Sequence, residues 1–380
     1  MIPLCVPNLT GNEARYLQEC VDSTFVSSVG PFVDRLEDMV AVAAGSQVRA
    51  VATSAGTTGL HAALTAVGVE RDDLVIMPAF TFVASANAVA HCGATPWLLD
   101  VTAESWTLDP ALLQRVLEVE TVRDGDVLRH RASGRRVAAV LPVHVLGCPA
   151  DMDAIVSVAR AHGLKVVADA AAALGCRYRG RRIAQLGADL SVVSFNGNKT
   201  VTAGGGGAVI GTDPDLLALV RHLTTTARVS PDYLHDRVGF NYRMTNLQAA
   251  VGCAQLERLD EFVAAKRRIR AAYDAAFAGR PDVGPFPQPQ WAESECWFSG
   301  FVLERAESMA ALRAGLRDRG IDARPFWRPM HLQPAFAEAL RTSMTVTESV
   351  WDRIVTLPCS TALTEAELES VVAAVEEVLG

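Results

Sequence analysis

The sequence has no long apolar run, no excess of positive charge and no paired-cysteine motif, and each absence excludes a class of protein. No uninterrupted apolar stretch reaches the roughly 18 residues that a membrane-spanning helix needs. The net charge of −8 and the pI near 5.5 argue against binding to nucleic acid or to an anionic membrane surface. The N-terminus lacks a basic segment followed by an apolar one, so we expect no secretory signal.

Eight cysteines are scattered along the chain, and none forms a Cys-x-x-Cys pair. This spacing disfavours a zinc site and a disulfide framework, so we expect reduced thiols, no metal and a cytoplasmic location. The sequence also contains neither a Walker phosphate loop nor Gly-x-Gly-x-x-Gly. Nucleotide hydrolysis and simple dinucleotide binding are therefore disfavoured.

What the sequence does contain is typical of a globular protein of two domains. Half of the 380 residues are hydrophobic and 21% are charged. We predict an N-terminal arm over residues 1–40, a large domain over 41–279 and a smaller α+β domain over 280–380, after a turn rich in proline. In the large domain, apolar runs alternate with helical patterns, which predicts an α/β fold with a mostly parallel sheet. Ligands of such sheets bind at the carboxyl ends of the strands.

One lysine lies where a structural lysine is unexpected. Lys199 follows the apolar run 189–193 and precedes the glycines 204–207, so it lies on a tight loop between two predicted strands. Burying an ammonium is costly unless it is paired or neutralised, and a Schiff base to a carbonyl cofactor removes that cost. A solvated surface lysine is the alternative. Asp169 ends the predicted strand 164–169, so both residues lie at strand ends and can face one pocket.

Several further residues allow both a functional and an ordinary interpretation. Gly56 and Thr57 open a helical run, which indicates either a phosphate site or a common N-cap. Phe82 could stack on a ring or belong to the core. His144 ends the apolar strand 137–145 and could be a site residue or a packed neighbour. The serines near Ser28 indicate a loop at a substrate mouth or a simple turn.

Taken together, six segments resemble the DegT-type sugar aminotransferase family. These are pyridoxal 5'-phosphate enzymes with the aspartate aminotransferase fold, called fold type I. The likeness covers nearly the whole chain in order, and within the family it is greatest to the aminotransferases that make UDP-bacillosamine and the legionaminic-acid precursor. The segments are Gly56-Thr57, Pro78–Ala84, Pro142–Gly147, Asp169–Ala171, Ser194-Phe195 with Lys199, and Gly239–Met244.

The resemblance implies a role for each matching residue. Lys199 would hold the cofactor and act as the general base, and Asp169 would keep the ring nitrogen protonated. Phe82 would stack on the ring, and Asn241 would reach the phosphate of the partner subunit in a homodimer with shared active sites. Residues implied for the phosphate are Gly56, Thr57, Thr58 and Ser194. Ser28, Arg243 and His331 are candidates for substrate contacts, although Arg243 could equally form a salt bridge.

The resemblance also implies a reaction, with one departure that affects the substrate. An amino group would pass from L-glutamate to the keto carbon of a nucleotide-linked 4-keto-6-deoxy sugar. Most members carry Gln, His or Glu three residues after the aspartate, whereas this chain has Ala172. This difference leaves open a non-sugar keto substrate, such as a cyclitol or a natural-product intermediate. A catalytically weak regulator that binds pyridoxal phosphate is the third alternative.

Overall fold

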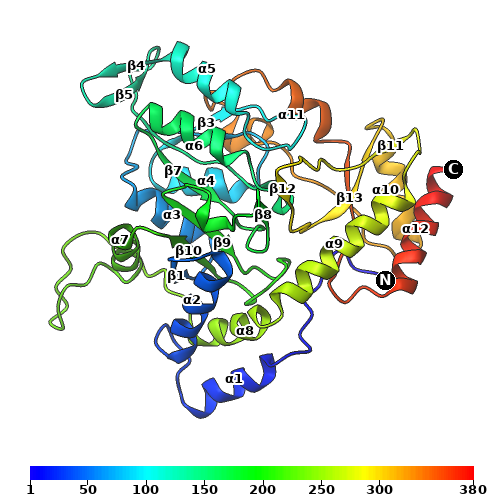
Figure 1. The fold of residues 1–380 in the computed structure, drawn as a ribbon, viewed down its shortest axis with the longest axis horizontal. Coiled ribbons are helices and arrows are strands. Elements are labelled where there is room, and N and C mark those ends of the chain that lie inside the picture. The colour runs from blue at the N-terminus through cyan, green and yellow to red at the C-terminus, as the bar shows by residue number, and fades with distance from the viewer.

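A computed structural model describes residues 1–380, and its largest sheet has seven strands. This sheet forms the middle layer of the larger region (Figure 1). The strand order is β1-β10-β9-β7-β6-β2-β3, and only β10 runs antiparallel to its neighbours. The predicted α/β fold with a mostly parallel sheet is confirmed. The strands of this sheet are β1 (Arg49–Thr53), β2 (Leu74–Pro78), β3 (Thr95–Leu99), β6 (Val137–Val140), β7 (Lys165–Asp169), β9 (Leu190–Ser194) and β10 (Gly207–Gly211).

Helices cover both faces of the central sheet because its strands are apolar on both sides. Alternate residues of each strand enter two separate cores, so that Val51 and Val209 lie in one and Ala50 and Ile210 in the other. The first core is covered by α3 (Gly56–Ala66), α4 (Val83–His91) and α7 (Pro214–Thr224). The second is covered by α2 (Pro31–Ala44), α5 (Pro110–Glu120), α6 (Met152–Ala161) and α8 (Asn246–Leu256), and α1 (Glu13–Asp22) packs on α8.

A smaller antiparallel sheet forms after residue 279, in the order β11-β13-β15-β14. Its strands are β11 (Val283–Gly284), β13 (Ser299–Leu303), β14 (Arg324–Pro325) and β15 (Ile354–Leu357), and the helices of this region are α10 (Ser308–Asp318), α11 (Thr345–Val350) and α12 (Glu365–Leu379). The long helix α9 (Leu259–Ala276) runs between the two regions (Figure 1). The domain limits 1–40, 41–279 and 280–380 remain a prediction.

Short elements complete the chain. The charged segment before β6 contains the hairpin β4 (Thr121–Asp124) and β5 (Val127–His130), and β8 (Arg177–Tyr178) pairs with β12 (Ala292–Glu293). Single 3₁₀ turns lie at Val145–Gly147, Ile183–Gln185, Met330–Leu332 and Pro334–Phe336. None of the helices combines the length and the apolar character that crossing a bilayer requires. No group of three or more His, Cys, Asp or Glu side chains is arranged to hold a metal ion.

One buried carboxylate joins three segments beneath the central sheet. Glu37 of α2 accepts a hydrogen bond from the Ala52 N–H of β1 at 2.8 Å. It also forms ion pairs with Arg243 at 2.9 Å and with Arg221 at 2.5 Å. The Arg243 side chain is only 9% exposed, so it depends on this partner for its charge to be compensated.

We expect Glu37→Ala to destabilise the protein by roughly 3–5 kcal/mol, because it leaves the Arg243 guanidinium buried and unpaired. Urea denaturation would measure the change in the free energy of unfolding. The control is Arg15→Ala, which breaks the exposed Arg15–Glu19 pair on α1 and should cost less than about 0.5 kcal/mol. Equal losses for the two variants would contradict this account of Glu37.

Candidate active site

A cavity of about 390 Å³ opens at the carboxyl edge of the central sheet. Residues that end or follow β1, β2, β6, β7 and β9 all line it, because parallel strands bring their carboxyl ends to one edge. Lys199 and Asp169, which are 30 positions apart in the sequence, both line this cavity. The structure therefore brings together the two residues on which the predicted chemistry depends.

The Lys199 amine lies over an aromatic ring and forms no ion pair. Its Nζ atom is 3.6 Å from the centroid of the Trp297 ring. Burial lowers the pKa of Lys199 to about 8, and the negative charge of Asp169 opposes that shift. Near neutral pH a part of the amine is therefore uncharged, which is the form that attacks a carbonyl and accepts a proton.

Asp169 is buried and held by two donors. The Ser85 hydroxyl donates to its Oδ2 atom at 2.6 Å, and the Ala171 N–H donates to its Oδ1 atom at 3.0 Å. Burial raises the pKa of Asp169, and these two hydrogen bonds partly offset the rise. A cation facing this carboxylate would restore its ionised form, and a protonated pyridine nitrogen is such a cation. Ser85 was not predicted from the sequence.

The other end of the cavity has the features of a phosphate cradle. Helix α3 begins at Gly56, and its first residues, Gly56 and Thr57, line the cavity with Ser194. The first N–H groups of a helix lack partners within the helix, and its dipole is positive at that end. A side chain at Gly56 would lie only 3.0 Å from the Ser194 Cβ atom, so glycine keeps the backbone open to a ligand. The chemistry of these residues fits pyridoxal phosphate.

The cavity wall contains both the unusual alanine and a histidine with an unsatisfied ring nitrogen. Ala172 lines the cavity, and so does His144. The Nδ1 atom of His144 accepts a hydrogen bond from the Ala150 N–H at 3.1 Å, whereas its Nε2 atom is buried without a partner. Burial lowers the pKa of His144 to about 4, so the ring is neutral and its Nε2 carries the proton. The Nε2–H group of His144 is therefore a buried donor in the cavity wall that has no acceptor.

Aromatic rings form the remaining wall. Phe82 lines the cavity and is 52% exposed, so its ring is accessible for stacking on a ligand. Trp297, Phe298 and Trp327 line the same cavity but were not predicted from the sequence. They come from the region after residue 279, where no motif or regular spacing marks them as site residues.

Two predicted residues do not reach the cavity. The Thr58 hydroxyl is used at the start of α3, where it donates to the Ala55 carbonyl at 2.9 Å. Arg243 was a candidate for substrate binding, but it is held in the ion pair with Glu37 and donates to the Ala52 carbonyl at 3.0 Å. The structure therefore agrees with the other prediction for Arg243, which was a salt bridge.

Three further predicted residues also lie outside the cavity of this chain. Ser28 and Asn241 are exposed on loops. His331 is buried and contacts Glu348, with 3.1 Å between its Nε2 atom and the Glu348 Oε1 atom. A role for Ser28 or Asn241 would need a second subunit or a bound substrate to bring a ligand to them.

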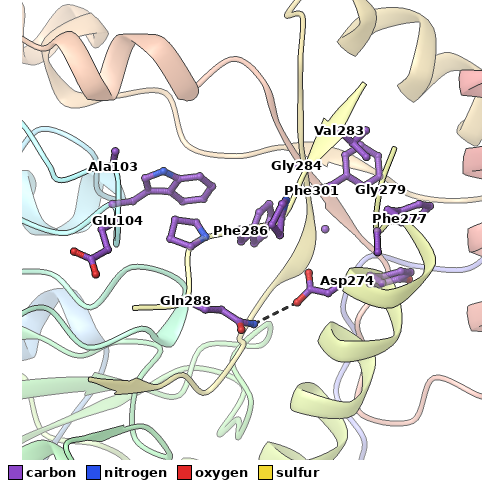
Figure 2. Close-up of a pocket in the computed structure, with 16 residues that line it drawn as sticks. Ala103, Glu104, Asp274, Phe277, Gly279, Val283, Gly284, Phe286, Gln288 and Phe301 are labelled. Atoms are coloured by element: carbon purple, nitrogen blue, oxygen red, sulfur yellow. Dashed lines mark hydrogen bonds between the residues drawn. The ribbon is translucent and has the colours of Figure 1, made fainter. Parts of the chain in front are cut away.

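A larger cavity, of about 730 Å³, has the wrong lining for this chemistry (Figure 2). It lies between α9 and the smaller sheet, and its walls include Trp106, Phe286 and Phe301. Its only charged side chains are Glu104 and Asp274, and Gln288 donates to Asp274 at 3.3 Å. Its lining has no lysine to bind a carbonyl cofactor and no helix N-terminus to bind a phosphate, so the smaller cavity is the candidate active site.

Comparisons with known proteins agree with this geometry. The model of the DegT/DnrJ/EryC1/StrS aminotransferase family matches residues 7–376. A GDP-perosamine synthase of Caulobacter vibrioides is 38% identical, covering 100% of this chain and 98% of that protein. A GDP-perosamine synthase of Escherichia coli O157:H7 is 34% identical, covering 97% and 95%. Neither name refers to bacillosamine or legionaminic acid, so the predicted closer likeness to those enzymes remains a prediction.

Among solved structures, S. venezuelae DesV superimposes with a TM-score of 0.85 at 32% identity, covering 96% of this chain and 94% of DesV. The family match extends over both regions of the fold and over every segment that lines the cavity. It confirms the expected fold type and the expected class of enzyme. The chain therefore belongs to the DegT/DnrJ/EryC1/StrS aminotransferase family, whose cofactor is pyridoxal 5'-phosphate.

Proposed function

We propose that this aminotransferase moves an amino group from L-glutamate to the keto carbon of a nucleotide-linked 4-keto-6-deoxy sugar. The observation that carries the amino-transfer chemistry is the presence of Lys199 and Asp169 in one cavity, beside the open N-terminus of α3. The sugar substrate rests on relatives named GDP-perosamine synthase, which align with 100% and 97% of this chain. Those names refer to a GDP-linked sugar.

Each cavity residue has a physical task in this proposal. Gly56, Thr57 and Ser194 would hold the phosphate, and Phe82 would cover the ring. Pyridoxal phosphate, when bound, supplies the electron sink that stabilises negative charge on the carbon losing its proton. Asp169 would keep the ring nitrogen protonated, and Ser85 fixes the orientation of that carboxylate.

Lys199 would both hold the cofactor and carry the proton. Burial lowers the pKa of the Lys199 amine, so a larger fraction of it is uncharged at neutral pH than in an exposed lysine. An uncharged amine above the reacting carbon can accept a proton from it and return the proton to a neighbouring atom. The Trp297 ring limits where the amine can move and keeps water from that side of it.

We further propose that two copies of the chain form the complete site. Asn241 is exposed and does not line the cavity of its own chain. It follows a loop on which Val229, Tyr233, Leu234 and Val238 are all exposed, and such apolar side chains gain from being covered. A two-fold dimer would cover them and let Asn241 contact the phosphate bound by its partner.

A non-sugar keto substrate is the second candidate. Ala172 and the unpartnered Nε2 atom of His144 favour it, because a substrate with its own oxygen at that point would replace the missing contact. A regulator that only binds the cofactor is disfavoured, because Lys199 and Asp169 are both in place.

The protein loaded with pyridoxal phosphate should absorb at about 400–430 nm, the range of a lysine-bound pyridoxal, and Lys199→Ala should abolish this band. Lys165→Ala is the matched control, because Lys165 is an exposed lysine paired with Asp189. A protein that takes up no cofactor, or a band that persists in Lys199→Ala, would contradict the assignment of Lys199.

The rate of cofactor uptake should rise with pH through a midpoint near 8, because the uncharged amine is the nucleophile and the pKa of Lys199 is about 8. The charge of Asp169 raises the pKa of Lys199, so Asp169→Asn should move the midpoint to lower pH. Stopped-flow absorbance on the protein stripped of cofactor measures both curves. A midpoint near 10, or an upward shift in Asp169→Asn, would contradict this reasoning.

Glutamate-dependent amination should proceed with UDP-, GDP- or TDP-linked 4-keto-6-deoxy sugars, and mass spectrometry of the products would identify the preferred nucleotide. A cyclitol ketone is included in the same panel. We expect at least a tenfold higher kcat/KM for the best nucleotide sugar than for the cyclitol ketone, about 1.4 kcal/mol in transition-state binding. Turnover of the cyclitol alone would favour the second candidate, and no turnover of glutamate would favour the regulator.

A further inference from the structure

A buried lysine outside the active-site cavity lies against two thiols. Lys266 of α9 is 1% exposed and forms no ion pair with a carboxylate. Its Nζ atom donates to the carbonyl oxygens of Trp297 at 2.9 Å and Cys359 at 2.7 Å. The same atom is 3.5 Å from the Cys5 Sγ atom and 3.6 Å from the Cys359 Sγ atom. A buried ammonium needs a counter-charge, and the two sulfur atoms are the groups in direct contact with Lys266; the buried Glu295 carboxylate interacts with its charge from further away and forms no ion pair with it.

The two thiols differ in their readiness to ionise. A hydrogen bond from Cys359 lowers the pKa of Cys5; burial opposes this, and the charge of Lys266 lowers it further. Burial raises the pKa of Cys359 well above its ordinary value. For Lys266, burial lowers the pKa, but the neighbouring sulfurs of Cys359 and Cys5 outweigh it. Of the two thiols, Cys5 therefore loses its proton more readily, and the Lys266 amine lies 3.5 Å from its sulfur, an arrangement typical of reactive cysteines.

Cys5 can be reached from outside, and Cys359 is beside it. Cys5 is half-buried and lines a cavity of about 340 Å³, whereas Cys359 is fully buried. The Cys359 N–H donates to the Leu4 carbonyl at 2.7 Å, which holds the two thiol-bearing segments side by side. A small oxidant entering the cavity meets Cys5 first, and only Cys359 is placed to react with the product.

We propose that Cys5 and Cys359 form a peroxide-reactive modification site, in which Cys5 is oxidised first and Cys359 then closes a disulfide. The Cys5 thiolate attacks one oxygen of hydrogen peroxide, breaking the O–O bond and giving a sulfenic acid and hydroxide. The Cys359 sulfur then attacks the Cys5 sulfur; an S–S bond forms, the S–O bond breaks, and the hydroxyl leaves as water with the thiol proton. Both sulfurs are oxidised by one electron, and the peroxide is reduced.

The modification site is connected to the loop that carries Lys199. The Cys5 Sγ atom lies 3.5 Å from the carbonyl oxygen of Asn198, the residue before Lys199. The same oxygen accepts a hydrogen bond from the Trp297 Nε1–H at 2.6 Å. A disulfide with Cys359 leaves the Cys5 sulfur without a proton to donate to Asn198 and without the negative charge that raises the pKa of Lys199, so it changes the surroundings of the segment that positions the Lys199 amine. Oxidation is therefore expected to weaken cofactor binding.

The test uses the reduced, full-length protein treated with hydrogen peroxide at neutral pH. Peptide mass spectrometry under non-reducing conditions should find Cys5 and Cys359 linked, with the mass of two hydrogen atoms lost, and dithiothreitol should reverse the link. Cys5→Ser and Cys359→Ser should each lose it. Cys92→Ser is the matched control and should keep it, because Cys92 is also half-buried but burial raises the pKa of its thiol to about 11.

Thiol labelling provides a second measurement that does not depend on activity. In the wild-type protein, iodoacetamide should label Cys5 at least ~10-fold faster than Cys92, and Lys266→Met should slow the labelling of Cys5. If Lys266→Met does not fold, the ratio of the labelling rates of Cys5 and Cys92 in the wild-type protein tests the proposal by itself. Equal rates for Cys5 and Cys92, or oxidation of Cys5 to the sulfinic acid without a link to Cys359, would overturn the proposal.

The connection to the active site is tested by the absorbance at about 400–430 nm that reports lysine-bound cofactor. Peroxide should release cofactor from the wild-type protein, and dithiothreitol should restore binding. Cys5→Ser should keep its cofactor under the same treatment. A linked pair with undiminished cofactor binding would overturn the connection between the thiols and Lys199.

Discussion

The candidate active site depends on two groups of opposite charge that are buried in one cavity without forming an ion pair with each other. If Lys199 and Asp169 formed a direct ion pair, the amine would be locked as an ammonium and the carboxylate would have no charge left for a ring nitrogen. Instead, Ser85 and the Ala171 N–H hold Asp169, and the Trp297 ring faces Lys199. A ligand long enough to lie between them, with an electrophilic carbon at one end and a basic nitrogen at the other, satisfies both.

The central sheet keeps these charges apart because they come from neighbouring parallel strands. Asp169 ends β7, and Lys199 lies in the loop after β9, which is the next strand in the sheet. The sheet is apolar on both faces and covered by helices, so packing on both sides holds the ends of its strands in place. The strand spacing, rather than any contact between the two side chains, sets the geometry of the site.

Much of this arrangement could be predicted from the sequence because it depends on local signals. Apolar runs located the strands next to Asp169 and Lys199, so these two residues were placed at one edge, and Gly56 was identified by the helical run that it opens. Ser85 could not be found in this way, since its contact with Asp169 spans 84 positions and nothing in its neighbourhood marks it. Trp297 and Trp327 come from the region with the shortest strands. Arg243 was predicted only as one of two alternatives, because its partner Glu37 is more than 200 positions away.

The attachment of the N-terminal segment has a consequence for how the protein is made. The Ile2 N–H donates to the Gly320 carbonyl, and the Leu4 carbonyl accepts from the Cys359 N–H. Each partner is synthesised more than 300 residues after the residue that it contacts. The segment of residues 2–4 must therefore stay unattached while more than 300 further residues are synthesised, and this wall of the molecule closes only after residue 359 has left the ribosome.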